Sequence, residues 1–331
     1  MIIKSVKLVN FRNHSEYSLE CTDETSLILG ENGCGKTSVL EAIYILTQGK
    51  SFRAVDAEIL KRGEDFYRVE IEFNNGEKNV VTYDGKEKNF VIVDKKFKRL
   101  PKKNRYPVVL FLPSDLNLIS SSPSRRRDYF DLVFGQFDGR YNDALLKYNK
   151  ALKQRNELLK SENLRPGDVF SWNMLLARYG CEIVKFRLEF VDEINKKLTS
   201  VYRSIAENED EVELILETQV EDVTEAQYLK QLETEFTRDT YLGHTSFGVH
   251  RDDFVFYLNE KVAEGSASRG EMRSIILALK FIEADLVYQK TGLKPVVLLD
   301  DVFSELDASR RKCLVQNFKG NQVIITSVEK V

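Results

Sequence analysis

The fold class of this 331-residue chain is decided by the segment Gly30-Glu31-Asn32-Gly33-Cys34-Gly35-Lys36-Thr37. It fits the pattern GxxxxGK[ST], in which glycines let backbone N–H groups turn toward a chain of phosphates. The run Ser26-Leu27-Ile28-Leu29 precedes it as a predicted strand, and apolar residues recur at helical spacing from Val39 to Leu46. A strand, a glycine-rich loop and a helix therefore follow one another directly, which is the context that a phosphate-binding P-loop requires.

Each residue type in this loop suits the binding of a nucleoside triphosphate. The Lys36 ammonium would reach the β and γ phosphates, and the Thr37 hydroxyl would bind Mg²⁺. Free N–H groups at the start of the following helix favour anions, as does the helix dipole. The predicted nucleotide-binding residues are Gly30, Glu31, Asn32, Gly33, Cys34, Gly35, Lys36, Thr37 and Ser38. A plain glycine-rich hairpin is the alternative, and the neighbouring strand and helix disfavour it.

A second candidate motif lies near the C-terminal end of the chain. The apolar run Val296-Val297-Leu298-Leu299 ends in two adjacent carboxylates, Asp300 and Asp301. In P-loop ATPases the first carboxylate at this position holds Mg²⁺, directly or through water, and the second orients or deprotonates the attacking water. We therefore expect Asp300 to be a metal ligand with Thr37, and Asp301 to be catalytic with Lys36. Two aspartates after a strand are more often a cap or a turn, but the upstream P-loop favours catalysis.

Two shorter motifs lie at predicted helix starts. Ser268-Arg269-Gly270-Glu271 opens a helix and matches the Ser-x-Gly-[Gln/Glu] signature of ABC-type ATPases. A second phosphate-facing helix start that cannot reach its own P-loop implies a partner subunit, so we expect Ser268, Gly270 and Glu271 to bind nucleotide in trans. Ser304-Glu305-Leu306-Asp307 matches the D-loop that crosses such a dimer interface, through Ser304 and Asp307. Simple helix capping is the alternative for both motifs.

The charged residues are unevenly distributed. The formal net charge is −3, but residues 86–105 are strongly basic and residues 207–235 are strongly acidic. A polyanion must therefore meet one face of the protein. Within the basic segment the candidate DNA-binding residues are Lys95, Lys96, Lys102 and Lys103. A solvated surface is the alternative reading of such a segment.

Three further cations are candidate DNA ligands. Arg125, Arg126 and Arg127 occupy the first turn of a predicted helix, where the helix dipole disfavours positive charge. Their position therefore needs another reason. Contact with DNA phosphates and pairing with acidic residues of another domain are equally good explanations.

No secretion or membrane signal is expected in this chain. Residues 1–8 mix charged with apolar residues, unlike a signal peptide, and no long apolar run follows. The four cysteines are far apart and form no CxxC pair, so we expect neither disulfides nor a zinc site. The cytoplasm is the expected location, with no membrane partner.

The order of predicted elements indicates an α/β fold with an insertion. Short strands over residues 66–112 are followed by long amphipathic helices over Tyr129–Leu159 and Trp172–Ala206, which should form an antiparallel hairpin. Strands return after Thr245. We expect an ABC-type P-loop ATPase head with an inserted helical lobe, and helices too short for a long coiled coil. The predicted boundaries are 1–120 for the P-loop part, 121–244 for the helical lobe, and 245–331 for the signature helix and remaining motifs.

Several longer strings allow a family to be identified. They are Asn10-Phe11-Arg12-Asn13, the P-loop, Ser51-Phe52-Arg53, Phe111-Leu112-Pro113-Ser114-Asp115-Leu116, Pro123 with Arg125-Arg126-Arg127, His250-Arg251-Asp252-Asp253, the signature, and Asp300-Asp301-Val302-Phe303-Ser304-Glu305-Leu306-Asp307. In this order they resemble the bacterial RecF family of SMC-like, ABC-type ATPases over nearly the whole chain. His-Arg-Asp-Asp and the last string are much more specific than a P-loop alone.

The resemblance implies a role in recombinational DNA repair, replication and the SOS response. It implies ATP and Mg²⁺ as cofactors, weak DNA-dependent ATP hydrolysis, and an ATP-dependent homodimer around two ATP molecules. It further implies binding to double-stranded and gapped DNA, and loading of RecA together with RecR and RecO.

The chain departs from related patterns at a few positions. The signature has Arg269, Glu271 and Met272 where RecF proteins often have glutamines, and Val249 replaces a usual proline before His250. No glutamine follows the predicted strand near Phe111, and Thr326-Ser327 stands where many ABC-type ATPases have a switch histidine. Both roles are left unassigned, with Thr326 as a candidate for the second.

Two alternative functions remain open from the sequence. A transport ATPase would share the main motifs, and the missing glutamine and histidine argue against it. A nucleotide-gated clamp with negligible hydrolysis is favoured by Asp301, which is one methylene shorter than the usual glutamate.

Overall fold

The computed structural model describes residues 2–220 and 222–328, so Glu221 of the predicted acidic segment lies outside the described residues. The chain forms two compact units. The first unit combines Met1–Leu116 with Glu283–Val331, and the second contains Asn117–Ile282. These boundaries assign residues 245–282, including the signature, to the unit that also contains the inserted helices. The first unit is thus assembled from both ends of the chain.

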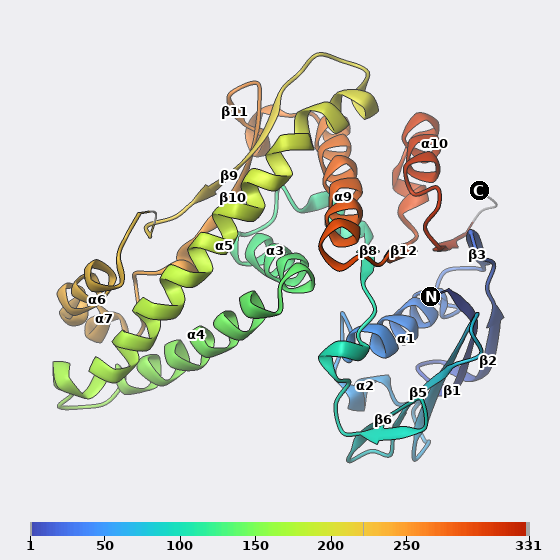
Figure 1. Ribbon diagram of the computed structural model, residues 1–331, viewed down its shortest axis with the longest axis horizontal. Helices are drawn as coiled ribbons and strands as arrows, with labels where there is room; N and C mark the ends of the chain where they lie inside the picture. The colour runs from blue at the N-terminus through green and yellow to red at the C-terminus, as the bar shows by residue number, and fades with distance from the viewer. Residues whose placement is uncertain (1, 221, 329–331) are drawn as a thin grey trace. The chain divides into compact units, whose positions relative to one another are not determined.

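The first unit contains two sheets (Figure 1). A six-stranded antiparallel sheet has the order β2-β1-β4-β5-β6-β7, and a four-stranded parallel sheet has the order β3-β13-β12-β8. The strands of the first sheet are β1 Ile3–Phe11, β2 His14–Glu20, β4 Tyr67–Phe73, β5 Lys78–Tyr83, β6 Lys88–Ile92 and β7 Lys95–Phe97. Those of the second are β3 Thr25–Leu29, β8 Val108–Phe111, β12 Val296–Asp300 and β13 Val323–Ser327.

The helix α1, Lys36–Gln48, lies at the centre of this unit because it contacts strands of both sheets. Its residues are buried except for Thr37, which is partly exposed. Apolar side chains from α1 and from both sheets form one core, which buries Ile3, Ile43 and Leu298 completely. This packing holds the start of α1 rigidly against the parallel sheet.

Shorter elements complete the first unit. They are α2 Asp56–Ile59, the 3₁₀ turns η1 Lys102–Asn104, η2 Pro113–Asn117 and η4 Val302–Glu305, and the helix α10 Ala308–Asn317. Gly76 and Gly85 have positive φ angles of 82° and 81° in the β4–β5 and β5–β6 connections, where turns were predicted. The turns and the strands around them are confirmed.

The second unit is built on long helices. Its elements are α3 Pro123–Phe137, α4 Gly139–Leu158, α5 Pro166–Ala206, β9 Val212–Glu217, α6 Glu225–Thr234, α7 Phe236–Leu242, η3 Val249–Arg251, β10 Asp253–Leu258, β11 Lys261–Val262 and α8 Ala263–Ser266. The signature helix α9, Arg269–Thr291, begins in this unit. The short strands β9, β10 and β11 form an antiparallel sheet.

The predicted helical hairpin is present, and its register is visible in two contacts. Arg155 near the end of α4 donates from Nε to Asn173 Oδ1 near the start of α5, at 2.7 Å. Arg187 further along α5 donates to the hydroxyl of Tyr141 near the start of α4. The two helices are therefore antiparallel and lie side by side (Figure 1). No longer coiled coil extends from them within the part of the chain that the structure describes.

The predicted helix boundaries need two corrections. The prediction of a single helix over Tyr129–Leu159 was wrong. Asp138 has an extended conformation, and its side chain caps the start of α4 by accepting a hydrogen bond from the N–H of Arg140. The second helix begins at Pro166 rather than at Trp172. Proline is well tolerated in the first turn of a helix, where its missing N–H would have no partner in any case. Among the described residues no helix is both long and apolar enough to cross a membrane.

Candidate active site

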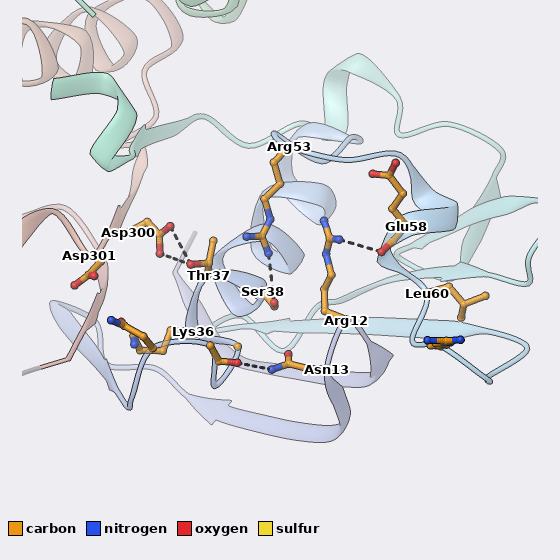
Figure 2. A pocket seen from close by; sticks show the side chains of 14 residues that line it. Arg12, Asn13, Lys36, Thr37, Ser38, Arg53, Glu58, Leu60, Asp300 and Asp301 are labelled. Carbon is orange, nitrogen blue, oxygen red and sulfur yellow. Dashed lines mark hydrogen bonds between the residues drawn. The ribbon is translucent and has the colours of Figure 1, made fainter. Parts of the chain in front are cut away.

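A cavity of about 580 Å³ lies at the start of α1 in the first unit. Its lining includes loop residues 32–38 apart from Cys34, together with Asp300 and Asp301 at the end of β12 (Figure 2). The parallel sheet therefore brings together the two predicted motifs, although they are about 260 residues apart in the sequence. The carboxyl ends of parallel strands are the usual place for a ligand in an open α/β sheet.

The glycine-rich loop has a backbone that requires glycine. Gly33 and Gly35 have φ angles of +84° and +101°, which side-chain-bearing residues rarely adopt. A Cβ atom on Gly35 would also lie 2.3 Å from Nε2 of His14. The Lys36 ammonium is buried and donates to the carbonyl oxygens of Gly30 and Glu31, at 2.7 and 2.9 Å. The loop thus curls around its own lysine.

The Thr37 hydroxyl and the Asp300 carboxylate are in direct contact (Figure 2). Thr37 Oγ1 lies 2.8 Å from Oδ1 and 3.0 Å from Oδ2 of Asp300. A second hydroxyl, that of Thr326 on β13, donates to Asp300 Oδ1 at 2.9 Å. A carboxylate held between two hydroxyls forms a compact set of hard oxygen donors.

Asp301 differs from Asp300 in its environment. It has a left-handed backbone conformation with φ +49°, and its Oδ1 atom is buried without a hydrogen-bond partner among the described residues. Burial raises the pKa of Asp301, and the charges of Asp300 and Glu305 act in the same direction, whereas Lys36 opposes them. A carboxylate with a raised pKa and an unpaired oxygen on a cavity wall can accept a proton.

Several residues of this site, among them Glu41, Arg12 and Arg53, were not predicted as site residues. Glu41 on α1 is completely buried and accepts from the guanidinium groups of Arg12, at 2.8 and 2.9 Å, and of Arg53, at 2.8 and 3.0 Å. Burial would raise the pKa of Glu41, but the hydrogen bonds from Arg12, Arg53 and Ser51 outweigh it and lower the pKa. Both arginines line the cavity. The sequence contains both arginines in strings that served to recognise the family, Asn10-Phe11-Arg12-Asn13 and Ser51-Phe52-Arg53. Neither string was given a role in the site.

The signature residues lie in the second unit, whereas the P-loop lies in the first. The N–H of Ser268 donates to Glu271 Oε2 at 2.6 Å, and the N–H of Glu271 donates back to Ser268 Oγ at 3.3 Å. This reciprocal pair is a capping box at the start of α9. Ser268 and Glu271 therefore cap α9, which was the alternative considered for this motif.

The D-loop residues also make capping contacts. Asp307 accepts from the N–H of Arg310 at 2.9 Å and so starts α10. The Ser304 hydroxyl donates to the carbonyl oxygen of Asp301 at 2.7 Å. Ser304 therefore holds the backbone of the residue that is predicted to be catalytic.

The candidate DNA-binding arginines lie in different environments. Arg126 is buried and forms an ion pair with Asp253, with distances of 2.7 and 2.5 Å. Arg127 donates to the carbonyl oxygen of Asp252 at 2.7 Å. Arg125 is exposed. Arg126 thus has an acidic partner, which was one of the two explanations considered, but this partner lies in the same compact unit. Because Arg126 is buried, the prediction that it contacts DNA was wrong.

The candidate lysines are all exposed. Lys95 and Lys96 lie on β7, at the edge of the six-stranded sheet, and Lys102 and Lys103 lie on η1 shortly after it. An edge strand with lysine side chains leaves its charges accessible to a polyanion.

The His-Arg-Asp-Asp string lies within a buried polar network. His250 Nδ1 is 2.8 Å from the hydroxyl of Tyr148, and its Nε2 is 3.0 Å from the carbonyl oxygen of Thr245. Asp252 accepts from Arg187 at 2.7 Å and from Thr218 at 2.6 Å. Ion pairs from Arg126 of α3 to Asp253 and from Arg187 of α5 to Asp252 thus hold this turn.

This network should make the stability of the second unit depend on pH. Burial lowers the pKa of His250 to about 4, whereas an unfolded chain takes up the proton near pH 6.5. The contribution of neutral His250 to the free energy of unfolding is therefore fully present above pH 6.5. It is lost as the pH is lowered toward 4, by at most about 3 kcal/mol. Thermal melts at pH 7 and pH 5 measure this loss. A His250→Gln chain should lose this part of the pH dependence, and a chain with the exposed His244 replaced by glutamine should keep it; equal behaviour of the two would refute the assignment.

Comparisons with known proteins agree with this fold. Residues 1–166 match the AAA ATPase domain family. The DNA replication and repair protein RecF of Clostridium perfringens is 34% identical over an alignment of 334 positions, which covers 98% of this chain and 92% of that protein. The protein of the same name from Agathobacter rectalis is 36% identical with the same coverage.

Solved structures give the same result. The recombination mediator protein RecF-ATP in the RecFOR pathway superimposes with a TM-score of 0.87 and 30% identity, over 99% of this chain and 92% of that one. The Smc head domain from Pyrococcus furiosus has a TM-score of 0.52 at 14% identity, which shows a shared fold alone. With relatives above 30% identity along nearly its whole length and an SMC-like ATPase fold, the chain belongs to the RecF family.

Proposed function

We propose that this chain is an ATP-binding protein of DNA replication and recombinational repair, which dimerises on DNA around two ATP molecules and hydrolyses ATP slowly. The observation that carries the proposal is the cavity at the start of α1, where the glycine-rich loop, the Thr37–Asp300 pair and Asp301 come together. The Oδ1 atom of Asp301 is buried there without a hydrogen-bond partner among the described residues. The similarity to RecF proteins along the chain, one of them named as an ATP complex, supports the ligand.

The residues of the cavity suit a magnesium nucleotide. Thr37 and Asp300 supply hard oxygen donors of the kind that Mg²⁺ prefers, and the loop glycines leave space for phosphates against the backbone. Bound Mg²⁺ would neutralise charge that develops on the phosphates. Lys36 would exchange its two carbonyl contacts for phosphate oxygens. Asp301 would orient the attacking water and take its proton.

The proposed dimer rests on the second phosphate-facing helix start. Ser268, Gly270 and Glu271 would approach the γ-phosphate bound to Lys36 of the partner chain, and Ser304 and Asp307 would cross the interface. ADP lacks the γ-phosphate, so ATP alone should bridge two chains. Size-exclusion chromatography with light scattering, run with ATP and with ADP, tests this directly. A mass that is the same with either nucleotide would overturn the proposed dimer.

DNA is the proposed macromolecular ligand, in double-stranded and gapped form, and RecR, RecO and RecA are the proposed protein partners. A cytoplasmic location belongs to the same proposal. The support is the family membership together with the exposed lysines of β7 and η1. Arg125 and Arg127 are secondary candidates on α3, and Arg126 is omitted because it is buried against Asp253.

Replacing Lys95, Lys96, Lys102 and Lys103 by glutamine should weaken DNA binding equally for different sequences. Each phosphate contact that is lost should reduce the slope of log affinity against log salt by about 0.9 for duplex DNA. Fluorescence anisotropy over a salt series measures both quantities. As a control, the exposed residues Lys150, Lys153, Lys160 and Lys185 of the second unit can be replaced in the same way. An unchanged slope in the first variant would place the DNA site elsewhere, with Arg125 examined next.

A second candidate function is a nucleotide-gated clamp that scarcely hydrolyses ATP. The short side chain of Asp301 favours it, because it holds the carboxylate closer to the backbone than a glutamate would. Single-turnover hydrolysis with and without DNA distinguishes the two functions. Turnover stimulated by DNA supports the ATPase, and the absence of turnover in a chain that dimerises with ATP supports the clamp.

A further inference from the structure

The hydroxyl of Thr326 lies between the two carboxylate residues of the candidate active site. Thr326 is completely buried near the C-terminal end of β13 and is paired with Asp300 in the parallel sheet. Its Oγ1 donates to Asp300 Oδ1 at 2.9 Å and accepts from the N–H of Asp301 at 2.9 Å. The single proton of the hydroxyl is therefore directed at Asp300, and a lone pair is directed at Asp301.

The surrounding strand shows that this hydroxyl is not needed for packing. Val323, Ile324 and Ile325 of β13 are apolar and buried. A valine at position 326 would have nearly the same shape and would avoid the cost of burying a polar group. Thr326 ends this apolar run and is followed by the buried Ser327. Its hydroxyl contacts Asp300 and Asp301 at 2.9 Å each and the Leu299 carbonyl oxygen only at 3.5 Å, so the two aspartates account for its presence.

The backbone of Asp301 is held at both ends. Its N–H donates to the Thr326 hydroxyl at 2.9 Å and also to the main-chain carbonyl oxygen of Thr326 at 3.2 Å. Its own carbonyl oxygen accepts from the Ser304 hydroxyl at 2.7 Å. Its φ angle of +49° is unfavourable for a residue with a side chain, by about 1 kcal/mol or more. Such a conformation persists where neighbouring groups over-determine it, and this occurs mainly at functional sites. Its side-chain Oδ1 atom, in contrast, has no hydrogen-bond partner within residues 2–220 and 222–328.

We infer that Thr326 is a positioning residue for ATP hydrolysis, which fixes the Asp300 carboxylate against Thr37 and holds the backbone of Asp301 so that its carboxylate remains on the cavity wall. This inference rests on the proposed ATPase function. Thr326 acts through the two carboxylates and not on the nucleotide.

The test compares three variants of the full chain. Thr326→Val removes the hydroxyl with little change of shape, and Thr326→Ser keeps it. Thr47→Val is the matched control. Among the described residues the buried Thr47 hydroxyl donates to the carbonyl oxygens of Ile43 and Tyr44 in α1, and it lies at the other end of the helix from Lys36. Three quantities are measured: single-turnover ATP hydrolysis, equilibrium binding of ATP, and thermal unfolding.

Thr326→Val should lower the hydrolysis rate about 10- to 100-fold, because hydrogen bonds to charged groups contribute this much to a barrier. Its ATP affinity should remain within about threefold of the parent, since no phosphate contact is removed. Thr326→Ser should restore the rate to within about threefold of the parent. Thr47→Val should lower the melting temperature by a similar amount to Thr326→Val without the loss of rate.

Three results would overturn the inference. Thr326→Val could hydrolyse ATP at the parent rate, or Thr326→Ser could fail to restore the rate. Thr326→Val could also lose ATP binding together with a much larger drop in melting temperature than Thr47→Val, which would make its role structural. A parent chain that binds ATP without hydrolysing it would overturn the ATPase function itself, and the inference with it.

Discussion

A chain carrying Asp301→Asn is expected to bind ATP as tightly as the parent and to hydrolyse it about 10²- to 10⁴-fold more slowly, which is the range that a general base contributes. Asparagine has the same shape as aspartate, so the left-handed backbone and its contacts with Thr326 and Ser304 can be retained. The amide cannot accept the proton of the attacking water. Because ATP then persists, the ATP-bound dimer should be long-lived.

The rate loss is measured in single-turnover experiments, and the dimer by light scattering over time. Asp23→Asn is a suitable control, because Asp23 is an exposed residue outside the cavity lining. Hydrolysis at the parent rate by Asp301→Asn would mean that another residue is the base. A loss of ATP binding would mean that Asp301 contributes to nucleotide affinity, contrary to the role argued from its unpaired oxygen.

The second large effect concerns the dimer. A Lys36→Met chain should lose ATP-dependent dimerisation, because the loop loses the ammonium that reaches the phosphates while its backbone is unchanged. A Ser268→Arg chain should still bind ATP through its intact loop, yet should not dimerise with itself, because the added side chain obstructs the interface. Neither variant alone should then hydrolyse ATP in a DNA-dependent manner.

Mixing the two variants gives a sharper result. A heterodimer would contain one intact composite site, made of Lys36 from the Ser268→Arg chain and Ser268 from the Lys36→Met chain. Some DNA-stimulated hydrolysis should return in the mixture, provided that one site holds the pair together. Recovery from two inactive variants would establish action in trans. If the Ser268→Arg chain instead lost ATP affinity as a monomer, the signature would act within its own chain.

Two controls separate this effect from damage to the fold. Ser268 caps α9, so Ser268→Arg also removes a capping oxygen, at a cost of about 1 kcal/mol. Ser268→Thr keeps a capping hydroxyl and should dimerise, and its melting temperature shows how much stability the cap contributes. Lys50→Met changes an exposed lysine shortly after α1 and should leave dimerisation unchanged.

The sequence by itself determined the parts of this protein that depend on neighbours along the chain. The strand, glycine-rich loop and helix at Lys36, the strand that ends in Asp300 and Asp301, and the helix start after Ser268 were all predicted and are present. Backbone conformation at these places is set by local periodicity and by glycine, so a short segment contains the necessary information. The family could be recognised for the same reason, because its motifs are short and ordered.

Only the tertiary structure decided which distant residues meet. The pairing of Glu41 with Arg12 and Arg53, the burial of Arg126 against Asp253, and the position of Thr326 depend on strands and helices brought together by the core. The helical spacing of apolar residues did not reveal the break at Asp138, because this spacing continues across it. Ion pairs and buried hydrogen bonds follow from the spatial arrangement of polar groups that must find partners once water is excluded. That arrangement is a property of the packed core, which no single segment of the sequence contains.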